Sequence, residues 1–261
     1  MTPQDSHVFL DHVRMEFDSR VVFEDLSCRF ARGRVCVLLG GSGSGKSTLL
    51  RMIAGLVQPS AGRLLVGEVD MIGASRSQLA AARERIGMLF QGGALLDSLT
   101  IFDNIALPLR EHTDLGPDEI SGRVHERLAA VGLVDVDDLL PGQLSGGMLR
   151  RAALARAIVR EPDLLLCDEP FSGLDPASVK RIETLLARLN RDLGITILIV
   201  SHHIPSTLRL ADEAMLLLPG RVIAGSPEAL RSSADAEVAD FFDEETAAED
   251  VGPAITEAPE P

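Results

Sequence analysis

Short apolar runs, each followed by a turn or by the start of a helix, recur along the chain. They are RVCVLLG at 34–40, GMLFQ at 87–91, LLLCDEP at 164–170 and GITILIVSHH at 194–203. Their length and aliphatic, β-branched content predict buried strands. The segment STLLRMIAGL, after the first run, has its apolar residues at helical spacing. Buried strands that alternate with helices indicate an α/β fold whose mostly parallel sheet is covered on both faces.

The strand signals disappear between Gln91 and about Val159, where helical patterns dominate. We therefore expect a helical subdomain at about 92–159, inserted into an α/β domain that spans 1–234. The remaining segment, 235–261, is rich in Ala, Pro and acidic residues and contains no basic residue. Because this composition buries too little apolar surface to offset the entropy of ordering, it predicts a largely disordered acidic tail, with VADFF at 238–242 as a candidate docking turn.

The bulk composition excludes some classes of function. The chain has 261 residues and a formal net charge of −14, so a nucleic-acid surface of clustered Lys and Arg is not expected. No apolar run approaches the roughly 18 to 20 residues that cross a bilayer, and the first residues carry charges where a signal peptide is apolar. These features predict a cytoplasmic protein. Cys28, Cys36 and Cys167 lack metal-ligand spacing and are expected to be reduced and structural.

The most specific motif, GGSGSGKST, stands between the first predicted strand and the helix that follows it. It matches G-x-x-x-x-G-K-[ST], in which backbone N–H groups and a helix N-terminus point at polyphosphate oxygens. Lys46 is expected to contact the β- and γ-phosphates, and the Ser47 hydroxyl to bind Mg²⁺. A glycine-rich turn that binds nothing is the alternative, which the strand–loop–helix context disfavours. The predicted phosphate-binding residues are Gly40, Gly41, Ser42, Gly43, Ser44, Gly45, Lys46, Ser47 and Thr48.

Two adjacent carboxylates, Asp168 and Glu169, end a buried apolar strand. This position places them at the carboxyl edge of the sheet, beside the phosphate loop. Asp168 would hold Mg²⁺ through water, and Glu169 would polarise the attacking water. Adjacent acids are usually only solvated, but the apolar strand before them and PFSGLDP after them favour a functional pair.

A further phosphate-binding feature opens the helix LSGGMLRRAALARAI at 144–158. Ser145, Gly146 and Gly147 offer a hydroxyl, bare N–H groups and the positive end of a helix dipole. The alternative is that Ser145 only caps the helix while the glycines form a turn.

The order and spacing of these motifs, with SGLD at 172–175 and VSHH at 200–203, resemble the nucleotide-binding subunits of ABC transporters over residues 8–232. The resemblance implies a P-loop NTPase of the ABC ATPase type, with a RecA-like sheet core, that binds ATP and Mg²⁺. It makes Gln91 the Q-loop glutamine, a further Mg²⁺ ligand, Asp175 the D-loop aspartate and His202 the switch histidine at the γ-phosphate. Phe17 takes the adenine-stacking position, although it could instead pack within a strand, and Phe23 is nearby.

In that family, the Ser145–Gly147 segment of one subunit closes over the ATP held by the other. The resemblance therefore implies a head-to-tail homodimer around two ATP molecules, with Lys46, Glu169 and His202 as its catalytic residues.

The stretch at 87–113, together with Met148 in place of a common glutamine, is similar to the ATPase subunits of Mla/Mce-type lipid transporters. The similarity implies a peripheral position on the inner face of the cytoplasmic membrane, with glycerophospholipid as cargo. It also implies an MlaE-type permease, an Mce-domain substrate-binding protein and, in some systems, a STAS-domain subunit as partners. His203 departs from the common pattern, which has aspartate there. It either alters hydrogen bonding beside His202 or faces solvent, and we favour solvent.

Two other classes of function remain open. One is the ATPase subunit of an ABC transporter for amino acids, metals or other small solutes. The other is an ABC ATPase that acts on DNA or ribosomes. The second class needs coiled-coil inserts, a basic face or two nucleotide-binding units, and the sequence has none of these features.

Overall fold

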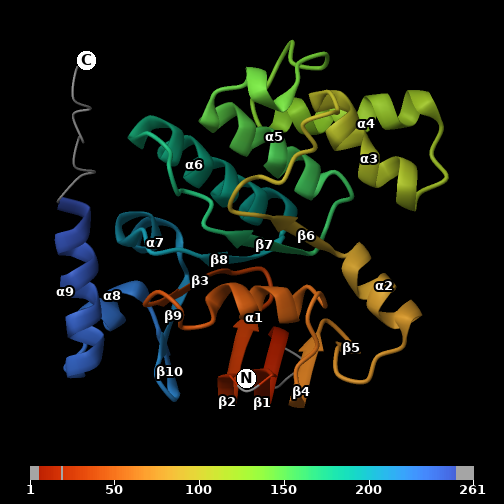
Figure 1. Ribbon diagram of the computed structural model, residues 1–261. Helices are drawn as coiled ribbons and strands as arrows, with labels where there is room; N and C mark the ends of the chain where they lie inside the picture. Colours follow the sequence, from red (N-terminus) through yellow and green to blue (C-terminus); the bar gives the residue numbers. More distant parts are fainter. Residues whose placement is uncertain (1–5, 19, 251–261) are drawn as a thin grey trace, which may run out of the picture.

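Two β-sheets form the framework of the computed structural model, which describes residues 6–18 and 20–250 (Figure 1). The larger sheet has six strands in the order β10-β9-β3-β8-β7-β6, and neighbours are parallel except β10 and β9. The α/β fold with a mostly parallel sheet is thus confirmed. The strands are β3 (Val35–Gly40), β6 (Ile86–Leu89), β7 (Leu164–Asp168), β8 (Thr196–Val200), β9 (Glu213–Leu218) and β10 (Arg221–Gly225).

The central strands are buried on both faces, because each face is covered. Every residue of β3, β7 and β8 is buried. Along β3, Val37 and Leu39 belong to one hydrophobic cluster, while Cys36 and Leu38 belong to the other. Alternate side chains of one strand therefore enter different cores, which explains why the sequence shows a continuous apolar run instead of alternation.

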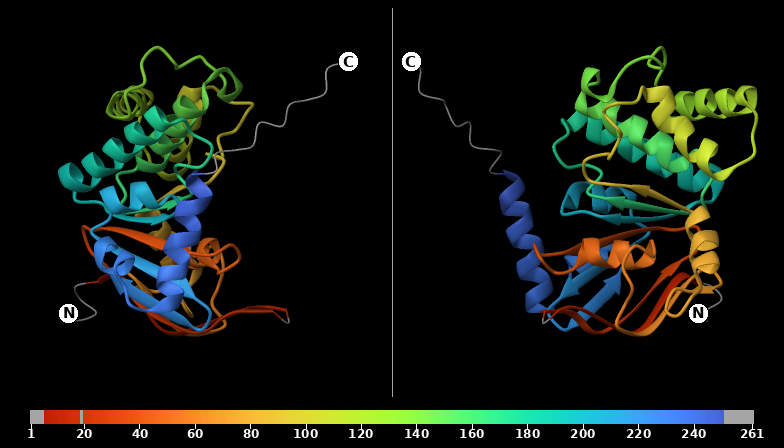
Figure 2. Two further views of the ribbon diagram at one scale, coloured as in Figure 1. Left: turned by 90° about the vertical axis from the view of Figure 1, so that its left-hand side faces the viewer. Right: turned by 45° about the vertical axis from the view of Figure 1, so that its right-hand side comes forward.

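Helices supply most of that cover (Figure 2). The described chain between β6 and β7 contains helices and no strand, and this group lies beyond one face of the sheet together with α6 (Figure 1). On the other face, α1 is packed between the two sheets. The helices are α1 (Lys46–Ile53), α2 (Arg76–Glu84), α3 (Ile101–His112), α4 (Pro117–Ala130), the 3₁₀ turn η2 (Pro141–Gln143), α5 (Gly146–Ile158), α6 (Pro176–Leu193), α7 (Ile204–Leu210), α8 (Pro227–Arg231) and α9 (Ala236–Asp250).

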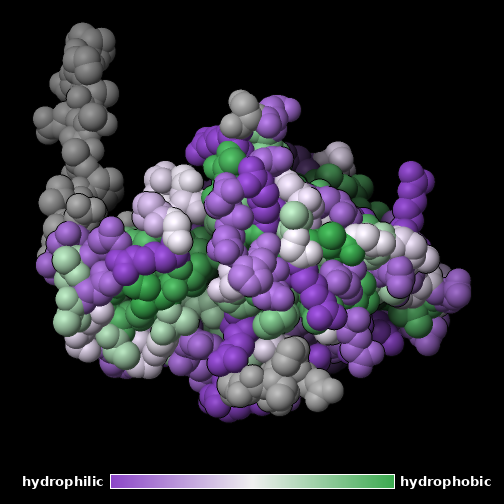
Figure 3. Space-filling model, turned by 90° about the horizontal axis from the view of Figure 1, so that it is seen from below, coloured by the Kyte–Doolittle hydropathy of each residue, from purple (hydrophilic) through white to green (hydrophobic). Residues whose placement is uncertain are grey.

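The smaller, antiparallel sheet has no counterpart in the strands expected from the sequence. Its order is β2-β1-β4-β5, formed by β1 (Ser6–Phe17), β2 (Arg20–Ala31), β4 (Ala61–Val66) and β5 (Val69–Asp70). Register shifts interrupt the pairing of β1 with both neighbours, so the two-residue period of its buried side chains is broken. In addition, half of the residues of β2 are exposed. Figure 3 shows the molecule from this side, with hydrophilic residues over much of the view.

The cysteines are free thiols held in apolar surroundings, as expected from the sequence. Burial raises the pKa of both Cys28 and Cys36 to about 12, and it also raises the pKa of Cys167. Protonated thiols of this kind pack as small apolar side chains and are poor nucleophiles.

The prediction of a largely disordered tail from residue 235 is wrong for Ala236–Asp250, which form α9. Val238, Phe241 and Phe242, from the segment expected to make a docking turn, are buried against the main core. The start of the helix is also fixed by charge, because Arg221 on β10 donates to both carboxylate oxygens of Asp235, at 2.7 and 2.9 Å. A few apolar residues and the ion pairs of Arg221 with Asp235 and Glu237 thus order an acidic segment. Residues 251–261 lie outside the described part of the chain.

A buried histidine connects the two sheets. His7 on β1 places Nδ1 2.6 Å from Thr196 Oγ1 on β8, and the same hydroxyl accepts from Gly33 N at 2.8 Å. Burial, with a smaller contribution from the charge of Arg32, lowers the pKa of His7 to about 4. The folded protein therefore holds this imidazole neutral.

Substituting His7→Asn should make stability less sensitive to acid. The His7 imidazole binds a proton near pH 6.5 in the unfolded chain but only near pH 4 in the folded chain. Burying neutral His7 therefore has no pH-dependent cost above pH 6.5, and the protein loses stability as the pH falls from 6.5 to 4. Between pH 7 and pH 5 the wild type should lose about 2 kcal/mol more free energy of unfolding than the variant. Urea unfolding at both pH values measures this difference. His112→Asn, at an exposed histidine of α3, is the matched control, and its free energy of unfolding should change between pH 7 and pH 5 as that of the wild type does.

Candidate functional site

The phosphate loop joins the end of β3 to the start of α1. Gly40, Gly43 and Gly45 have positive φ angles, and a Cβ on Gly45 would lie 2.6 Å from the Phe23 ring. Within the described chain α1 begins without a side-chain cap and without an acidic residue in its first turn. Its first N–H groups are therefore available to an anion. Lys46 Nζ donates to the carbonyls of Gly40 and Gly41, at 2.6 and 3.0 Å, so its charge lies over the loop.

Two of the three residues expected to bind Mg²⁺, Ser47 and Asp168, are in contact. Ser47 Oγ donates to Asp168 Oδ1 at 3.2 Å, across a sequence separation of 121 residues. No cluster of three His, Cys, Asp or Glu that could hold a metal occurs in the described residues. A hydroxyl and one carboxylate nevertheless suit Mg²⁺, which takes its remaining ligands from phosphate and water in such sites. Buried Ser44 Oγ, which has no hydrogen-bond partner among the described residues, is a further polar group that a phosphate would satisfy.

Glu169 and His202 form the second half of the site. Their side chains meet at 3.0 Å, from His202 Nδ1 to Glu169 Oε1, and the Glu169 side chain is 14% exposed against 54% for His202. Glu169 has a positive φ of 48°, an unfavourable conformation for a non-glycine residue. Its backbone N–H donates to Val200 O on β8, at 2.9 Å, which fixes this turn. The geometry places a carboxylate and an imidazole together at the carboxyl edge of the sheet.

The Ser145–Gly147 segment lies against the segment that follows Glu169, not against the phosphate loop of its own chain. Ser145 Oγ accepts from Met148 N at 3.3 Å and caps α5, whereas Gly146 and Gly147 are the first residues of the helix and do not form a separate turn. A Cβ on Gly147 would lie 2.5 Å from Ser178 Oγ on α6. Asp175 caps α6 by accepting from the N–H groups of Ala177 and Ser178, and the hydrogen bonds from Ser178 lower its pKa.

Phe17 and Phe23 differ in exposure, which bears on which of them could stack on a base. Phe17, at the end of β1, is 46% exposed, whereas Phe23 is 8% exposed and packs against the phosphate loop at Gly45. The hairpin of β1 and β2 that carries both residues thus reaches the loop. Phe17 stays the candidate for adenine stacking, and Phe23 has a packing function.

Gln91 lies in an exposed turn after β6, and among the described residues no hydrogen bond or ion pair joins its side chain to the groups above. Its backbone carbonyl instead accepts a hydrogen bond from Arg150 of α5, a buried residue that the sequence did not single out. The doubled arginine in LSGGMLRR was the available signal, but helical spacing alone does not say which carbonyls an arginine reaches.

The comparisons with known proteins agree with this arrangement of loops. The family model described as ABC transporter matches residues 23–172, which include the phosphate loop, Ser145–Gly147 and the Asp168–Glu169 pair. The chain belongs to the ABC transporter family of ATP-binding proteins. It is accordingly an ATPase that binds ATP, and its parallel sheet and inserted helices are those of an ABC cassette.

Similar curated proteins share most of this cassette. The chain is 44% identical over 226 residues to the intermembrane phospholipid transport system ATP-binding protein MlaF of Escherichia coli K12, covering 86% of this chain and 84% of the relative. It is 39% identical over 241 residues to the probable ribonucleotide transport ATP-binding protein mkl of Mycobacterium tuberculosis H37Rv, covering 92% of this chain and 67% of that protein.

A solved ABC cassette has the same fold. The dimeric structure of a post-hydrolysis state of the ATP-binding cassette MJ0796, bound to ADP and Pi, has a TM-score of 0.77 and 28% identity, covering 84% of this chain and 98% of that one. In the part of this ABC ATPase that the structure describes, no helix has the length and apolar character needed to span a membrane.

The expectation that His203 of this ABC ATPase faces solvent is wrong. His203 caps α7 by accepting from Ser206 N at 3.2 Å, and its ring lies 5.9 Å from that of Phe171. Ser206 in turn donates to buried Glu183 at 2.5 Å. Histidine thus provides the helix cap that an aspartate side chain can also provide, so the departure preserves a local function.

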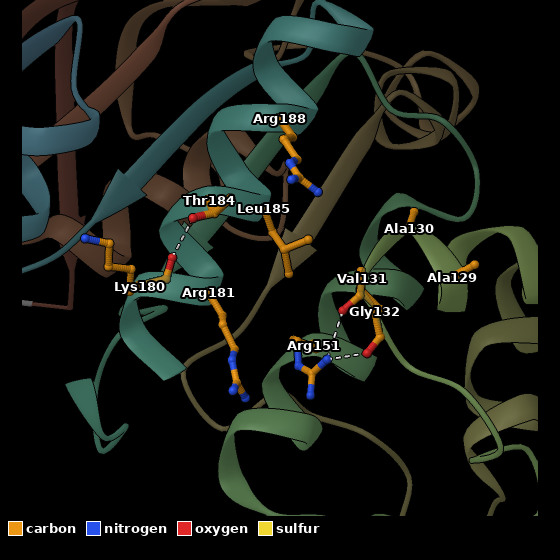
Figure 4. Close-up of a pocket in the computed structure, with 10 residues that line it drawn as sticks. All are labelled: Ala129, Ala130, Val131, Gly132, Arg151, Lys180, Arg181, Thr184, Leu185 and Arg188. Carbon is orange, nitrogen blue, oxygen red and sulfur yellow. Dashed lines mark hydrogen bonds between the residues drawn. The ribbon is translucent and has the colours of Figure 1, made fainter. Parts of the chain in front are cut away.

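A separate pocket of about 340 Å³ opens between α6 and the junction of α4 with α5 (Figure 4). Lys180, Arg181 and Arg188 of α6 line one side of it. Arg151 of α5 lines the other and donates to the carbonyls of Val131 and Gly132. None of its lining residues is a predicted nucleotide-binding residue, so this pocket is distinct from the ATP site.

Replacing Glu169 with Gln should slow ATP hydrolysis by about a hundredfold or more, because an amide cannot accept the proton of the attacking water. ATP binding should be retained, since Lys46, Ser47 and the loop are untouched, and an ATP-bound dimer should accumulate. Phosphate release and size-exclusion chromatography with ATP measure both effects. Glu111→Gln, at an exposed position of α3, is the control. Normal phosphate release by the Glu169 variant would show that another group activates the water.

Proposed function

We propose that this ABC ATPase is the motor subunit of a lipid transporter, with glycerophospholipid as the transported class. The observation that carries the proposal is the 44% identity to MlaF, a phospholipid transport ATP-binding protein, over 86% of this chain. A second MlaF, from Haemophilus influenzae, is also 44% identical over 85% of this chain. An alignment of this length includes the helical segment after β6.

The partners in this proposal are those implied by the resemblance to the ATPase subunits of Mla/Mce-type lipid transporters. The chain would act as a homodimer with an MlaE-type membrane permease, an Mce-domain substrate-binding protein and, in some systems, a STAS-domain subunit. It would then lie on the inner face of the cytoplasmic membrane. The domain division would be an ABC ATPase domain at 1–234, with its helical subdomain at about 92–159, followed by the acidic segment.

Each predicted site residue has a place in hydrolysis. Lys46 and the N–H groups of the phosphate loop would hold the β- and γ-phosphates, while Ser47, Asp168 and Gln91 would hold Mg²⁺. Bound Mg²⁺ would neutralise charge on the phosphate oxygens. Glu169 would accept a proton as the water oxygen attacks the γ-phosphorus and the bond to the bridging oxygen of ADP breaks. His202, whose ring lies against Glu169, would contact the γ-phosphate.

The second phosphate contact would come from another subunit. Ser145, Gly146 and Gly147 lie at the start of α5, packed on α6 and not on the phosphate loop of their own chain. A second copy arranged head to tail would present this helix start to the γ-phosphate, and the dimeric state of the MJ0796 cassette supports such an arrangement. Asp175 lies beside the same contact.

Transport of a different solute is the second candidate. The similarity to mkl, named as a probable ribonucleotide transport ATP-binding protein, supports keeping this candidate, because the same motor can serve several cargoes. An ATPase acting on DNA or ribosomes is less well supported, since the net charge of −14 opposes binding to nucleic acid.

The membrane partner distinguishes these candidates. When the tagged chain is purified from detergent-solubilised membranes of its own cells, mass spectrometry should identify an MlaE-type permease and an Mce-domain protein. Liposomes containing that complex should then move labelled glycerophospholipid only with hydrolysable ATP. Copurification with an amino-acid or metal permease would instead reject the lipid assignment and leave the ATPase assignment intact.

A bulky charge at the start of α5 should block the dimer. Ser145→Arg is expected to abolish ATP hydrolysis, because the side chain would project into the space that the partner's ATP occupies, whereas ATP binding by the monomer should persist. Fluorescent-nucleotide titration and phosphate release separate the two effects. Ser77→Arg, at an exposed position of α2, should leave both unchanged. Full hydrolysis by Ser145→Arg would contradict the shared-site arrangement.

A further inference from the structure

Helix α5 holds the loop that carries Gln91 through a buried arginine. Arg150 Nη1 donates to the carbonyls of Phe90, at 3.3 Å, and Gln91. The other terminal nitrogen, Nη2, donates to Ser172 O at 3.2 Å, in the segment between Glu169 and Asp175. One guanidinium thus connects three functional segments: the start of α5, the Gln91 loop and the segment after β7.

A second arginine of α5 holds the rest of the same loop. Arg156 Nη1 donates to Ala94 O at 2.8 Å, and its Nη2 donates to Gly93 O at 3.0 Å. Four carbonyls of the loop, at Phe90, Gln91, Gly93 and Ala94, therefore face arginine donors from one helix. We call Arg150 and Arg156 the arginine clamp.

The loop is shaped to receive the arginine clamp. Gly93 and Ala94 both have positive φ angles, and Gly93 N donates back to Phe90 O at 2.8 Å. A Cβ on Gly93 would lie 3.3 Å from Cβ of Ala153 on α5, so the backbone of the loop comes close to the helix. This close approach turns the carbonyls of the loop toward the two guanidinium groups.

Burial disfavours the charged forms of both arginines of the arginine clamp. Burial lowers the pKa of Arg150, an effect that the nearby Glu169 carboxylate partly opposes, and it lowers the pKa of Arg156 as well. Among the residues that the structure describes, no ion pair joins either guanidinium to a carboxylate, and both guanidinium groups donate to backbone carbonyl oxygens. A guanidinium that binds only carbonyls through both nitrogens fixes backbone geometry more than it balances charge.

We infer that Arg150 and Arg156 are positioning residues that make the Gln91 loop and the start of α5 move as one unit. In a head-to-tail dimer, α5 grips the ATP of the partner while the Gln91 loop serves the ATP of its own chain. The arginine clamp therefore links the closure of one ATP site to the geometry of the other. Because α5 and the loop are separated by 50 or more residues, this link arises only from the folded contacts. The inference rests on the proposed functions of Gln91 and Ser145–Gly147 in hydrolysis and is independent of the transported solute.

Arg150→Gln and Arg156→Gln test the inference in the full chain. Each variant should bind ATP within about twofold of the wild type, because the phosphate loop is unchanged. The kcat should fall by about ten- to a hundredfold, as for a displaced group near the reaction. The Mg²⁺ concentration for half-maximal activity should rise severalfold, which a general loss of folding would not produce. Arg150→Lys, which keeps the charge but reaches fewer carbonyls, should recover part of the kcat.

Arg151→Gln is the matched control. Arg151 is adjacent on α5 and also donates to two carbonyls, but these belong to Val131 and Gly132. Its kcat and Mg²⁺ dependence should match those of the wild type. If the clamp variants behave like Arg151→Gln, or if their kcat and ATP affinity fall in parallel with unchanged Mg²⁺ dependence, the inference is wrong.

Hydrogen exchange tests the coupled movement directly. In the wild type, ATP and Mg²⁺ should change amide protection in peptides covering both 86–96 and 144–152. In Arg156→Gln, whose side chain is only half-buried, the change at 144–152 should persist while the change at 86–96 becomes smaller, because only Arg150 still holds the loop. If ATP and Mg²⁺ changed the amide protection of both peptides in this variant as much as in the wild type, the inference would be overturned even if Arg150→Gln fails to fold. Because wild-type ATP hydrolysis and the effect of Glu169→Gln are measured separately, a failure here is distinguishable from a failure of the ATPase site.

Discussion

The hydrogen bond between Ser47 and Asp168 is the contact on which the site depends, because it joins the start of α1 to the end of β7. Strands β3, β8 and β7 are parallel neighbours, so their carboxyl ends lie side by side. The phosphate loop follows β3, His202 follows β8, and the acidic pair follows β7. The fully buried strands keep these ends in register, and the apolar core therefore determines the distance between the carboxylates and the phosphate loop.

Capping and first-turn charge together separate the helix starts that can receive phosphate from those that cannot. Side-chain caps occupy the starts of α2, α3, α6, α7 and α8. In the described chain both α1 and α4 begin at a glycine without a side-chain cap, but α4 carries Asp118 and Glu119 in its first turn, whereas the first turn of α1 has no acidic residue. The start of α5 is intermediate, since Ser145 caps it but two glycines follow. A phosphate from a partner could therefore bind at α5 if Ser145 exchanged its internal hydrogen bond for an external one.

The sequence predicted those parts of the molecule that are encoded by short, continuous motifs. The phosphate loop, the strands β3, β6, β7 and β8, and the Asp168–Glu169 pair are continuous motifs with characteristic spacing. The antiparallel sheet was not predicted, because irregular register in β1 conceals its alternation. Helix α9 was misjudged from composition, since burial of Val238, Phe241 and Phe242 depends on a surface built by distant residues. The arginine clamp was invisible for the same reason.

Helix α5 combines two tasks that place opposite demands on its sequence. Its first turn must expose backbone N–H groups, and glycine leaves them accessible. Its later turns must fix the Gln91 loop, so they need long cationic side chains and a small residue, Ala153, where the loop approaches the helix. Burial beside Phe90, Gln91 and Ser172 disfavours the charged form of Arg150. Truncating its side chain would nevertheless leave the carbonyls of these three residues without the guanidinium that donates to them. A helix under these constraints behaves as a rigid connector, so a force applied at Ser145 reaches Gln91 through guanidinium groups and not through the intervening chain.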